Sequence, residues 1–113
     1  MRENYTSVRE ISVEEFDEMI ENHDDLLIVD VRDATQFHQG HIPGALLIPN
    51  GMLDDTMVNQ LFAARQKTLV LCSQNGSDCS APANKLQQTG FEKVYCLAGG
   101  VSRWQAQGYA LIK

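Results

Sequence analysis

The chain has 113 residues, of which 43% are hydrophobic and 21% charged, as in an ordinary soluble protein with one core. Nine basic residues stand against fifteen acidic ones, and the net charge of -6 argues against a protein that binds nucleic-acid phosphates. No apolar run reaches the length of a membrane helix, and residues 1–5 lack the apolar stretch of a signal peptide, so we expect a cytoplasmic protein. Three cysteines, an odd number, then predict no complete disulfide framework.

The acidic charge is concentrated near the N-terminus. Residues 1–33 hold eleven acids and three bases, a net charge of -8, whereas residues 34–113 hold four acids and six bases, a net charge of +2. Such a segment is either the solvated face of an amphipathic helix, which we favour, or an acidic docking surface. A site within residues 34–113 is therefore surrounded by a slightly basic segment, although the net charge of the whole chain is negative.

The N-terminal half predicts one clear helix and one buried strand. Ser12 and Glu15 form a capping box that starts a helix running to about Asn22. The apolar run 26–31 is too short for a helix and is typical of a strand covered on both faces in a parallel sheet. Shorter elements are then expected: a helical turn at 34–37 that ends at Gly40, and a strand at 45–48 closed by Pro49.

The C-terminal half continues the alternation of helices and strands. The expected elements are a helix from about Leu53 to Arg65, a strand at 68–72, a helix from about Ser80 to Thr89, a strand at 94–97 and a helix at 101–107. This pattern predicts one α/β domain over residues 1–113, with a central, mostly parallel sheet of four to five strands flanked by helices.

Cys72 is the candidate nucleophile because it ends a predicted strand of that sheet. Ligands of open α/β sheets bind beyond the carboxyl ends of the strands. Loop amides and the start of the following helix favour a thiolate, so this setting is expected to lower the pKa of the thiol. The small polar loop 73–78 could cradle an anion, and Gly76 gives it conformational freedom. The alternative is a cysteine that only finishes a buried strand.

Four motifs in order resemble the rhodanese homology domain. They are Leu27-Ile28-Val29-Asp30-Val31-Arg32; the segment 37–49 with Gly40-His41-Ile42-Pro43-Gly44-Ala45; the loop opened by Cys72; and Gly90-Phe91-Glu92-Lys93-Val94 followed by Leu97-Ala98-Gly99-Gly100-Val101-Ser102-Arg103-Trp104. The resemblance covers about residues 10–110. It implies a rhodanese-like three-layer domain and a single-domain sulfurtransferase.

The resemblance also implies roles for individual residues. Cys72 matches the cysteine that accepts a sulfane sulfur as a persulfide. The loop that matches the cradle for this sulfur consists of Ser73, Gln74, Asn75, Gly76, Ser77 and Asp78. Asp30 and Arg32 match a charged pair that supports the rim of the site. His41 is expected to hold a turn by hydrogen bonds, with general-base duty as the alternative. The glycines at 99–100 are expected to form a turn, and Trp104 to lie in the core.

The loop departs from the pattern of this family. Its glycine, Gly76, lies four residues after Cys72 rather than three, so the loop resembles the longer one of related phosphatases and arsenate reductases. Those enzymes hold their oxyanion with an arginine fork at the position that Asp78 occupies here. A carboxylate there disfavours phosphate and arsenate, and it argues against the thiosulfate dianion as the preferred donor.

Cys79 follows Asp78 at the expected start of a helix, where the family often has serine. It is a possible second reactive thiol, which would resolve a persulfide or sulfenate on Cys72 by forming a disulfide. The alternative, which we favour, is a serine-like substitution without chemistry. Cys96, in the middle of a strand, is expected to lie in the core.

The sequence therefore predicts a sulfurtransferase of the thiosulfate sulfurtransferase type. A sulfane sulfur would move from thiosulfate, a polysulfide or a protein persulfide, through Cys72, to cyanide, a thiol or a sulfur-carrier protein. No metal or organic cofactor is expected, and neither nucleic acid nor a membrane is an expected partner. Two other readings stay open: a non-catalytic rhodanese-like interaction module that uses the acidic helix, and a phosphatase or arsenate reductase.

Overall fold

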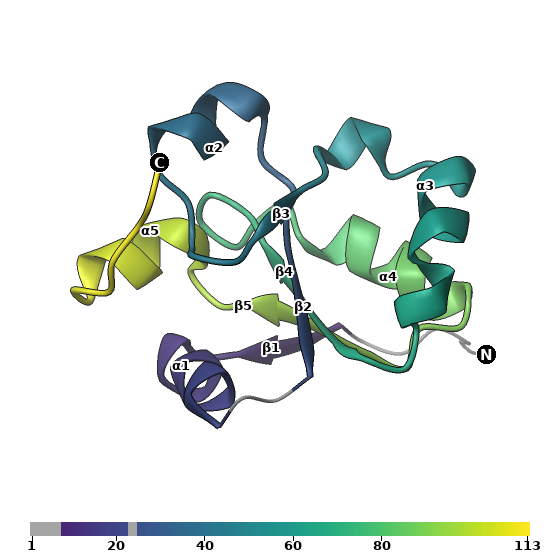
Figure 1. Cartoon of the computed structure of the whole chain (residues 1–113), viewed down its shortest axis with the longest axis horizontal. Helices are drawn as coiled ribbons and strands as arrows, with labels where there is room; N and C mark the ends of the chain where they lie inside the picture. Colours follow the sequence, from purple (N-terminus) through teal and green to yellow (C-terminus); the bar gives the residue numbers. More distant parts are fainter. Residues whose placement is uncertain (1–7, 23–24) are drawn as a thin grey trace.

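Five parallel strands form the central sheet of the computed structural model, which describes residues 8–22 and 25–113 (Figure 1). The sheet has the order β1-β5-β4-β2-β3, and every neighbouring pair is parallel. The strands are β1 (Arg9–Ile11), β2 (Leu26–Asp30), β3 (Leu46–Leu47), β4 (Thr68–Cys72) and β5 (Lys93–Leu97). The predicted α/β class and parallel sheet are confirmed.

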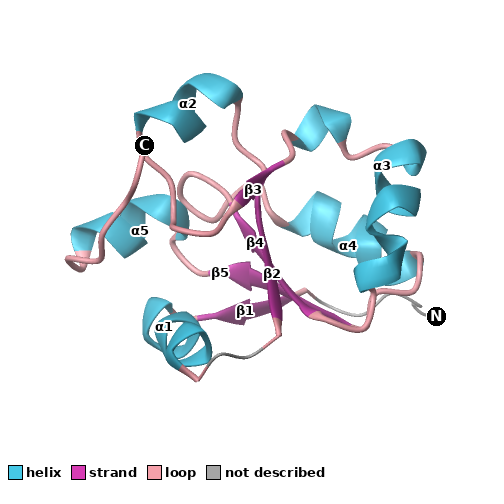
Figure 2. Ribbon diagram, in the orientation of Figure 1, coloured by secondary structure: helices cyan, strands magenta, loops and turns pink. Residues whose placement is uncertain are grey.

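Helices cover both faces of this sheet (Figure 2). The elements are α1 (Val13–Glu21), α2 (Ala34–Gln39), α3 (Asp55–Leu61), α4 (Ser80–Gln88) and α5 (Gly100–Ala106), with short 3₁₀ turns η1 (Asn50–Met52) and η2 (Phe62–Ala64). Buried side chains of α3 and α4 pack on one face, and those of α1 and α5 pack on the other. Each helix in the described part of the chain is too short or too polar to cross a bilayer.

The predicted capping box starts α1 as expected. The Ser12 hydroxyl accepts a hydrogen bond from the Glu15 amide at 3.0 Å, and the Ser12 amide donates to the Glu15 carboxylate at 2.9 Å. Val13 and Phe16 then turn inward and are fully buried beside Trp104 of α5. The local cap and the buried stripe therefore specify the same helix.

One strand was missed, and the ends of several elements differ from the sequence predictions. The strand β1 was not predicted, because it has three residues at the edge of the sheet and two of them are exposed. The strand predicted to reach Val31 ends at Asp30. The helix predicted from Leu53 to Arg65 is shorter: the Asp54 carboxylate caps the Met57 amide at 3.0 Å, so α3 starts at Asp55, and its last turn tightens into η2.

Side chains alternate between the two faces along β4, and this alternation places the cysteines. Leu69 and Leu71 belong to the core under α3 and α4, which also contains Cys79 and Cys96. Val70 and Cys72 belong to the core under α1 and α5. The sheet therefore separates Cys72 from the other two cysteines.

Candidate active site

Cys72 is the last residue of β4 and lies at the carboxyl edge of the sheet. Its Cα is the register partner of Asp30, the last residue of β2. The residue is completely buried, and it is the only free cysteine in the described ranges. The fold therefore brings this thiol to the edge where open α/β sheets bind their ligands.

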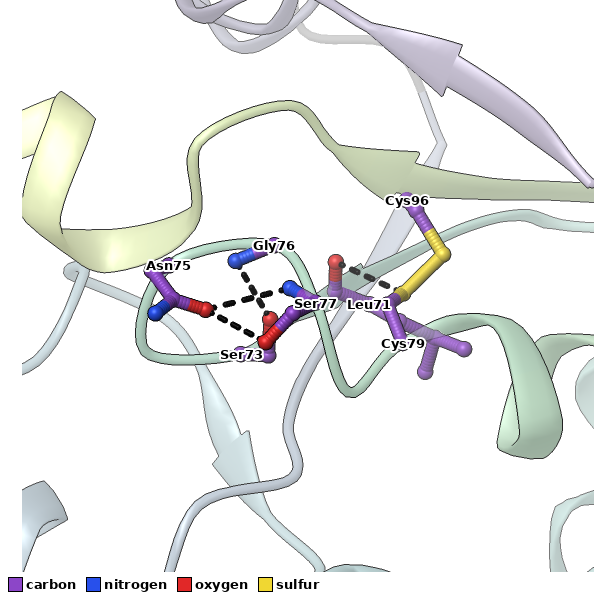
Figure 3. The surroundings of a disulfide bond; sticks show 7 residues. All are labelled: Leu71, Ser73, Asn75, Gly76, Ser77, Cys79 and Cys96. Atoms are coloured by element: carbon purple, nitrogen blue, oxygen red, sulfur yellow. Dashed lines mark hydrogen bonds between the residues drawn. A yellow bond between two sulfur atoms is a disulfide. The ribbon is translucent and has the colours of Figure 1, made fainter.

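The loop from Ser73 to Asp78 forms a tight turn directly after this cysteine (Figure 3). The Gly76 amide donates to the Ser73 hydroxyl at 2.8 Å, and the Ser77 amide donates to the Asn75 side-chain oxygen at 3.1 Å. Gly76 has a φ of 92°, in the left-handed region that favours glycine. The amides of Gln74, Asn75 and Asp78 have no acceptor among the described residues. Three loop amides are thus without a protein acceptor in this arrangement.

The loop is docked on the start of α5. The amides of Val101 and Ser102 donate to the carbonyl oxygens of Ser73 and Gln74, each at 2.9 Å. A Cβ added at Gly100 would collide with Ser73 and would lie 2.8 Å from the Asn75 amide nitrogen. The glycine pair at 99–100 therefore lets two backbones approach closely, which is a more specific role than the predicted turn.

Arg32 connects the end of β2 to this loop. Its guanidinium forms a buried, bidentate ion pair with Asp30: Nε donates to Oδ1 at 3.0 Å and Nη2 donates to Oδ2 at 2.8 Å. Nη1 donates to the Gln74 side-chain oxygen at 3.1 Å, and Nη2 donates to the Gly40 carbonyl oxygen at 2.8 Å. The Gln74 side-chain nitrogen donates to Ser102 at 2.9 Å. A chain of polar contacts thus runs from β2 across the loop to α5.

The pKa of the Cys72 thiol is raised, not lowered as the sequence predicted. Burial raises this pKa most, the Asp30 carboxylate raises it further, and Arg32 acts in the opposite direction. The prediction was wrong because the side chain of Cys72 is completely buried in the core under α1 and α5 and lies beside the Asp30 carboxylate, which the position at a strand end did not indicate. In this closed arrangement the thiol is protonated at neutral pH.

His41 lies beside α2 and the C-terminal segment. Its ring stacks on Phe37, with centroids 3.7 Å apart, and Nδ1 lies 2.9 Å from the Phe37 carbonyl oxygen. Its backbone pairs with Ile112 in both directions, at 2.8 and 2.9 Å. These contacts hold the residue in place, whereas no hydrogen bond joins its ring to the loop within the described residues.

Cys79 and Cys96 form a disulfide, which the sequence did not predict (Figure 3). Both are buried, and the Cys79 sulfur lies 3.7 Å from the Leu71 carbonyl oxygen on the α4 face of the sheet. Cys79 is therefore not the free second thiol that was considered, and it is not positioned on the face of Cys72. Cys96 lies in the core as expected, but as half of a disulfide. The bridge fastens the end of the loop to β5.

The remaining site residues are exposed on the loop or on α5. Asp78 is exposed, and no hydrogen bond or ion pair joins its side chain to the described residues. Sequence reasoning missed Ser102 and Arg103 as neighbours of the loop. The signal was present: adjacent glycines at 99–100 predict a place where another backbone comes close, and these two residues follow directly.

Comparisons with known proteins identify the family that the chain is similar to. The profile of the family described as "Rhodanese-like domain" matches residues 12–107. The thiosulfate sulfurtransferase GlpE of Pseudoalteromonas translucida is 31% identical over 87% of this chain and 90% of its own. The uncharacterized protein YibN of Escherichia coli K12 is 29% identical over 81% of this chain. The matched region covers 64% of the length of YibN, so the chain spans less than two thirds of that relative. The crystal structure of BH2092 from Bacillus halodurans superposes with a TM-score of 0.80 and 25% identity, over 92% of this chain and 76% of that one.

Proposed function

Because the chain belongs to the rhodanese-like family, we propose that it is a sulfurtransferase that carries a sulfane sulfur as a persulfide on Cys72. The observation that carries this proposal is the position of Cys72, a free thiol at the carboxyl end of β4, followed directly by a loop in which three amides have no protein acceptor. We also propose that residues 1–113 form a single rhodanese-like domain.

The reaction has two steps. The Cys72 thiolate attacks the outer sulfur of the donor, the S–S bond of the donor breaks, and the rest of the donor leaves with the electron pair, as sulfite in the case of thiosulfate. A nucleophile such as cyanide, a thiol or a sulfur-carrier protein then attacks the transferred sulfur and restores the Cys72 thiolate. The free amides of Gln74, Asn75 and Asp78 supply fixed dipoles for the negative charge on the persulfide. This covalent exchange produces ping-pong kinetics.

Burial of Cys72 adds a condition to this mechanism. The residue has no exposed surface, so a donor reaches its sulfur only when some of the elements that cover it move. The same movement brings water to the thiol and lowers its pKa toward the ordinary range. Exposure of Cys72 therefore precedes sulfur transfer.

A donor panel with intact-mass detection tests the proposal. Protein incubated with thiosulfate, polysulfide or an organic persulfide gains the mass of one sulfur atom, and cyanide removes it. The variant Cys72→Ser gains nothing, because the disulfide leaves no other free cysteine in the described ranges. An adduct of the same size on Cys72→Ser would place the sulfur elsewhere and overturn the proposal.

The second candidate is a non-catalytic interaction module, and the raised pKa of Cys72 favours it. Buried cysteines in apolar surroundings are usually inert. In this case no donor adds sulfur to the chain, while a partner protein still binds through the acidic surface of α1. The donor panel therefore separates the two candidates, and a generic phosphate ester added to it tests the phosphatase reading that Asp78 disfavours.

A cytoplasmic location is also part of the proposal. Small thiols and carrier proteins, which would accept the sulfur, are abundant there. Disulfides are rare in that compartment, so the state of Cys79 and Cys96 is informative. Counting free thiols after rapid alkylation of whole cells gives one thiol per chain if the bridge forms in the cell and three if it does not.

A further inference from the structure

An open cavity lies between the loop and α5. It has a volume of about 450 Å³ and is lined by Asn75, Gly99, Ser102, Arg103, Ala106 and Gln107. This is the size of sites that bind small organic molecules, and a thiosulfate ion would fill only a fraction of it. One wall of the cavity therefore belongs to the loop that follows Cys72.

The side chain of Arg103 and the tip of the loop contact the same glycine. A Cβ added at Gly99 would lie 2.5 Å from both Cβ and Nε of Arg103, so the arginine folds back over Gly99. A Cβ added at Gly76 would lie 2.9 Å from the Gly99 amide nitrogen. Arg103 thus packs over Gly99, the residue that the tip of the loop also contacts, and it lines the same cavity as Asn75 of the loop.

The charge of Arg103 is not neutralised by the residues that the structure describes. Arg32 is paired with Asp30, Lys67 with Asp25 and Lys85 with Asp55, whereas no ion pair or side-chain hydrogen bond joins Arg103 to a described residue. The loop itself contains no basic residue between Ser73 and Asp78, and Asp78 adds a negative charge. Arg32 also reaches the loop, but its charge is paired, so the unpaired positive charge next to the loop comes from Arg103 of α5.

We propose that the cavity between the loop and α5 binds the anionic group of a small organic sulfur compound, with Arg103 as the residue that selects for its negative charge. The ligand class is a low-molecular-weight persulfide that carries a carboxylate or sulfonate. This inference rests on the proposed function for its reaction: Cys72 attacks the outer sulfur, the S–S bond of the persulfide breaks, and the organic thiolate leaves with the electron pair. The proton of the donor stays on the transferred sulfur.

Three thiosulfonate reagents of similar size but different charge test the selectivity of the cavity for anions without requiring sulfur transfer. Methanethiosulfonates with a sulfonatoethyl, hydroxyethyl or trimethylammonioethyl group differ in charge and react alike: the thiolate of Cys72 attacks the thiol sulfur and methanesulfinate leaves. Labelling rates are read by intact mass. In Arg103→Gln the anionic reagent reacts about fivefold more slowly, the neutral reagent is unchanged and the cationic reagent is faster.

Two variants serve as controls. Lys93→Gln makes the same change of net charge at the exposed start of β5, which lies at the end of the sheet opposite the loop. We expect this variant to leave the relative labelling rates of the three reagents unchanged. Arg103→Lys restores most of the preference for the anionic reagent. An equal loss of rate with all three reagents in Arg103→Gln would mean a purely structural role and would overturn the inference.

A second measurement decides the question if the buried thiol resists all three reagents. Mercaptosuccinate, a thiol with two carboxylates, is titrated into isotopically labelled protein, and the amide resonances of Asn75, Ser102 and Arg103 are followed. We expect shifts that saturate, with at least fivefold weaker binding in Arg103→Gln. Absent shifts, or shifts unchanged in the variant, overturn the inference. Failure of the sulfur panel alone overturns only the proposed function.

Discussion

Arg32 donates a hydrogen bond to the side chain of Gln74, 42 residues later in the chain, and so joins the end of β2 to the loop that follows Cys72. The same glutamine donates to Ser102 on α5. Although Gln74 is exposed on the surface, its side chain connects the two elements between which the loop is held. From its position in a small polar loop, the sequence predicted a role only for its backbone amide.

Replacing Gln74 loosens the loop. In Gln74→Leu both side-chain hydrogen bonds are lost, and we expect amide exchange of Val101 and Ser102, which donate to the loop carbonyls, to accelerate about tenfold. Ser102→Ala removes only one of the bonds and gives a smaller acceleration. Hydrogen exchange followed by NMR measures both, and equal exchange in Gln74→Leu and the parent protein would contradict a tethering role.

Alkylation of Cys72 depends steeply on pH. Because burial and the Asp30 carboxylate raise the pKa of the thiol, the thiolate is a minor species at neutral pH, and the rate with iodoacetamide rises about tenfold per pH unit between pH 7 and 9. Asp30→Asn removes a charge that raises the pKa, so its rate at a given pH is higher. Protein unfolded in urea supplies the profile of the ordinary thiol, and a plateau near neutral pH in the folded protein would contradict the raised pKa.

Reduction of the disulfide between Cys79 and Cys96 destabilises the fold. The bridge joins residues 17 apart, and opening a loop of this length costs about 3 kcal/mol of unfolding free energy. Urea unfolding with and without a phosphine reductant measures the loss, in a Cys72→Ser background where only this pair responds. The variant Cys79→Ala/Cys96→Ala is the control, since the reductant leaves its unfolding midpoint unchanged.

Comparing alanine variants of Gly100 and Gly108 separates the effect of steric contact from that of backbone strain. Both have positive φ, 62° and 93°, so alanine is strained by about 1 kcal/mol at either position. A Cβ at Gly108 meets open space, whereas one at Gly100 collides with the loop backbone. We expect Gly108→Ala to lose about 1 kcal/mol and Gly100→Ala about 3 kcal/mol or more, with slower sulfur transfer only in the latter. Equal losses in urea unfolding would contradict the tight docking of loop and α5.

Much of this fold was predictable because its signals are local. The capping box at Ser12 and the apolar runs of β2 and β4 specify their elements within a few residues. Two features were missed, one that depends on a tertiary contact and one whose signal is itself local. The strand β1 has only Ile11 buried and gains its identity by pairing with β5. The helix α3 is shortened because Asp54 caps it.

The cysteines show where sequence reasoning about the site reached its limit. The position of Cys72 follows from the end of a buried strand, but its high pKa depends on complete burial beside Asp30. The pairing of Cys79 with Cys96 depends on which face of the sheet each residue occupies. Cys96 follows Val94 by two residues and therefore shares its face, and the start of α4 lies over the same face. That parity was available from the sequence, whereas the side on which α4 packs was not.

The alternation of side chains along β4 has a chemical consequence. Leu71 points toward the disulfide and Cys72 points away from it, so one peptide layer stands between an oxidised sulfur pair and a reduced single thiol. The proposed persulfide on Cys72 would be shielded by this layer from intramolecular exchange with the bridge, which would otherwise spread the sulfur over three sites. The sheet thus keeps a disulfide and a free thiol within one small protein, each in the core on its own face.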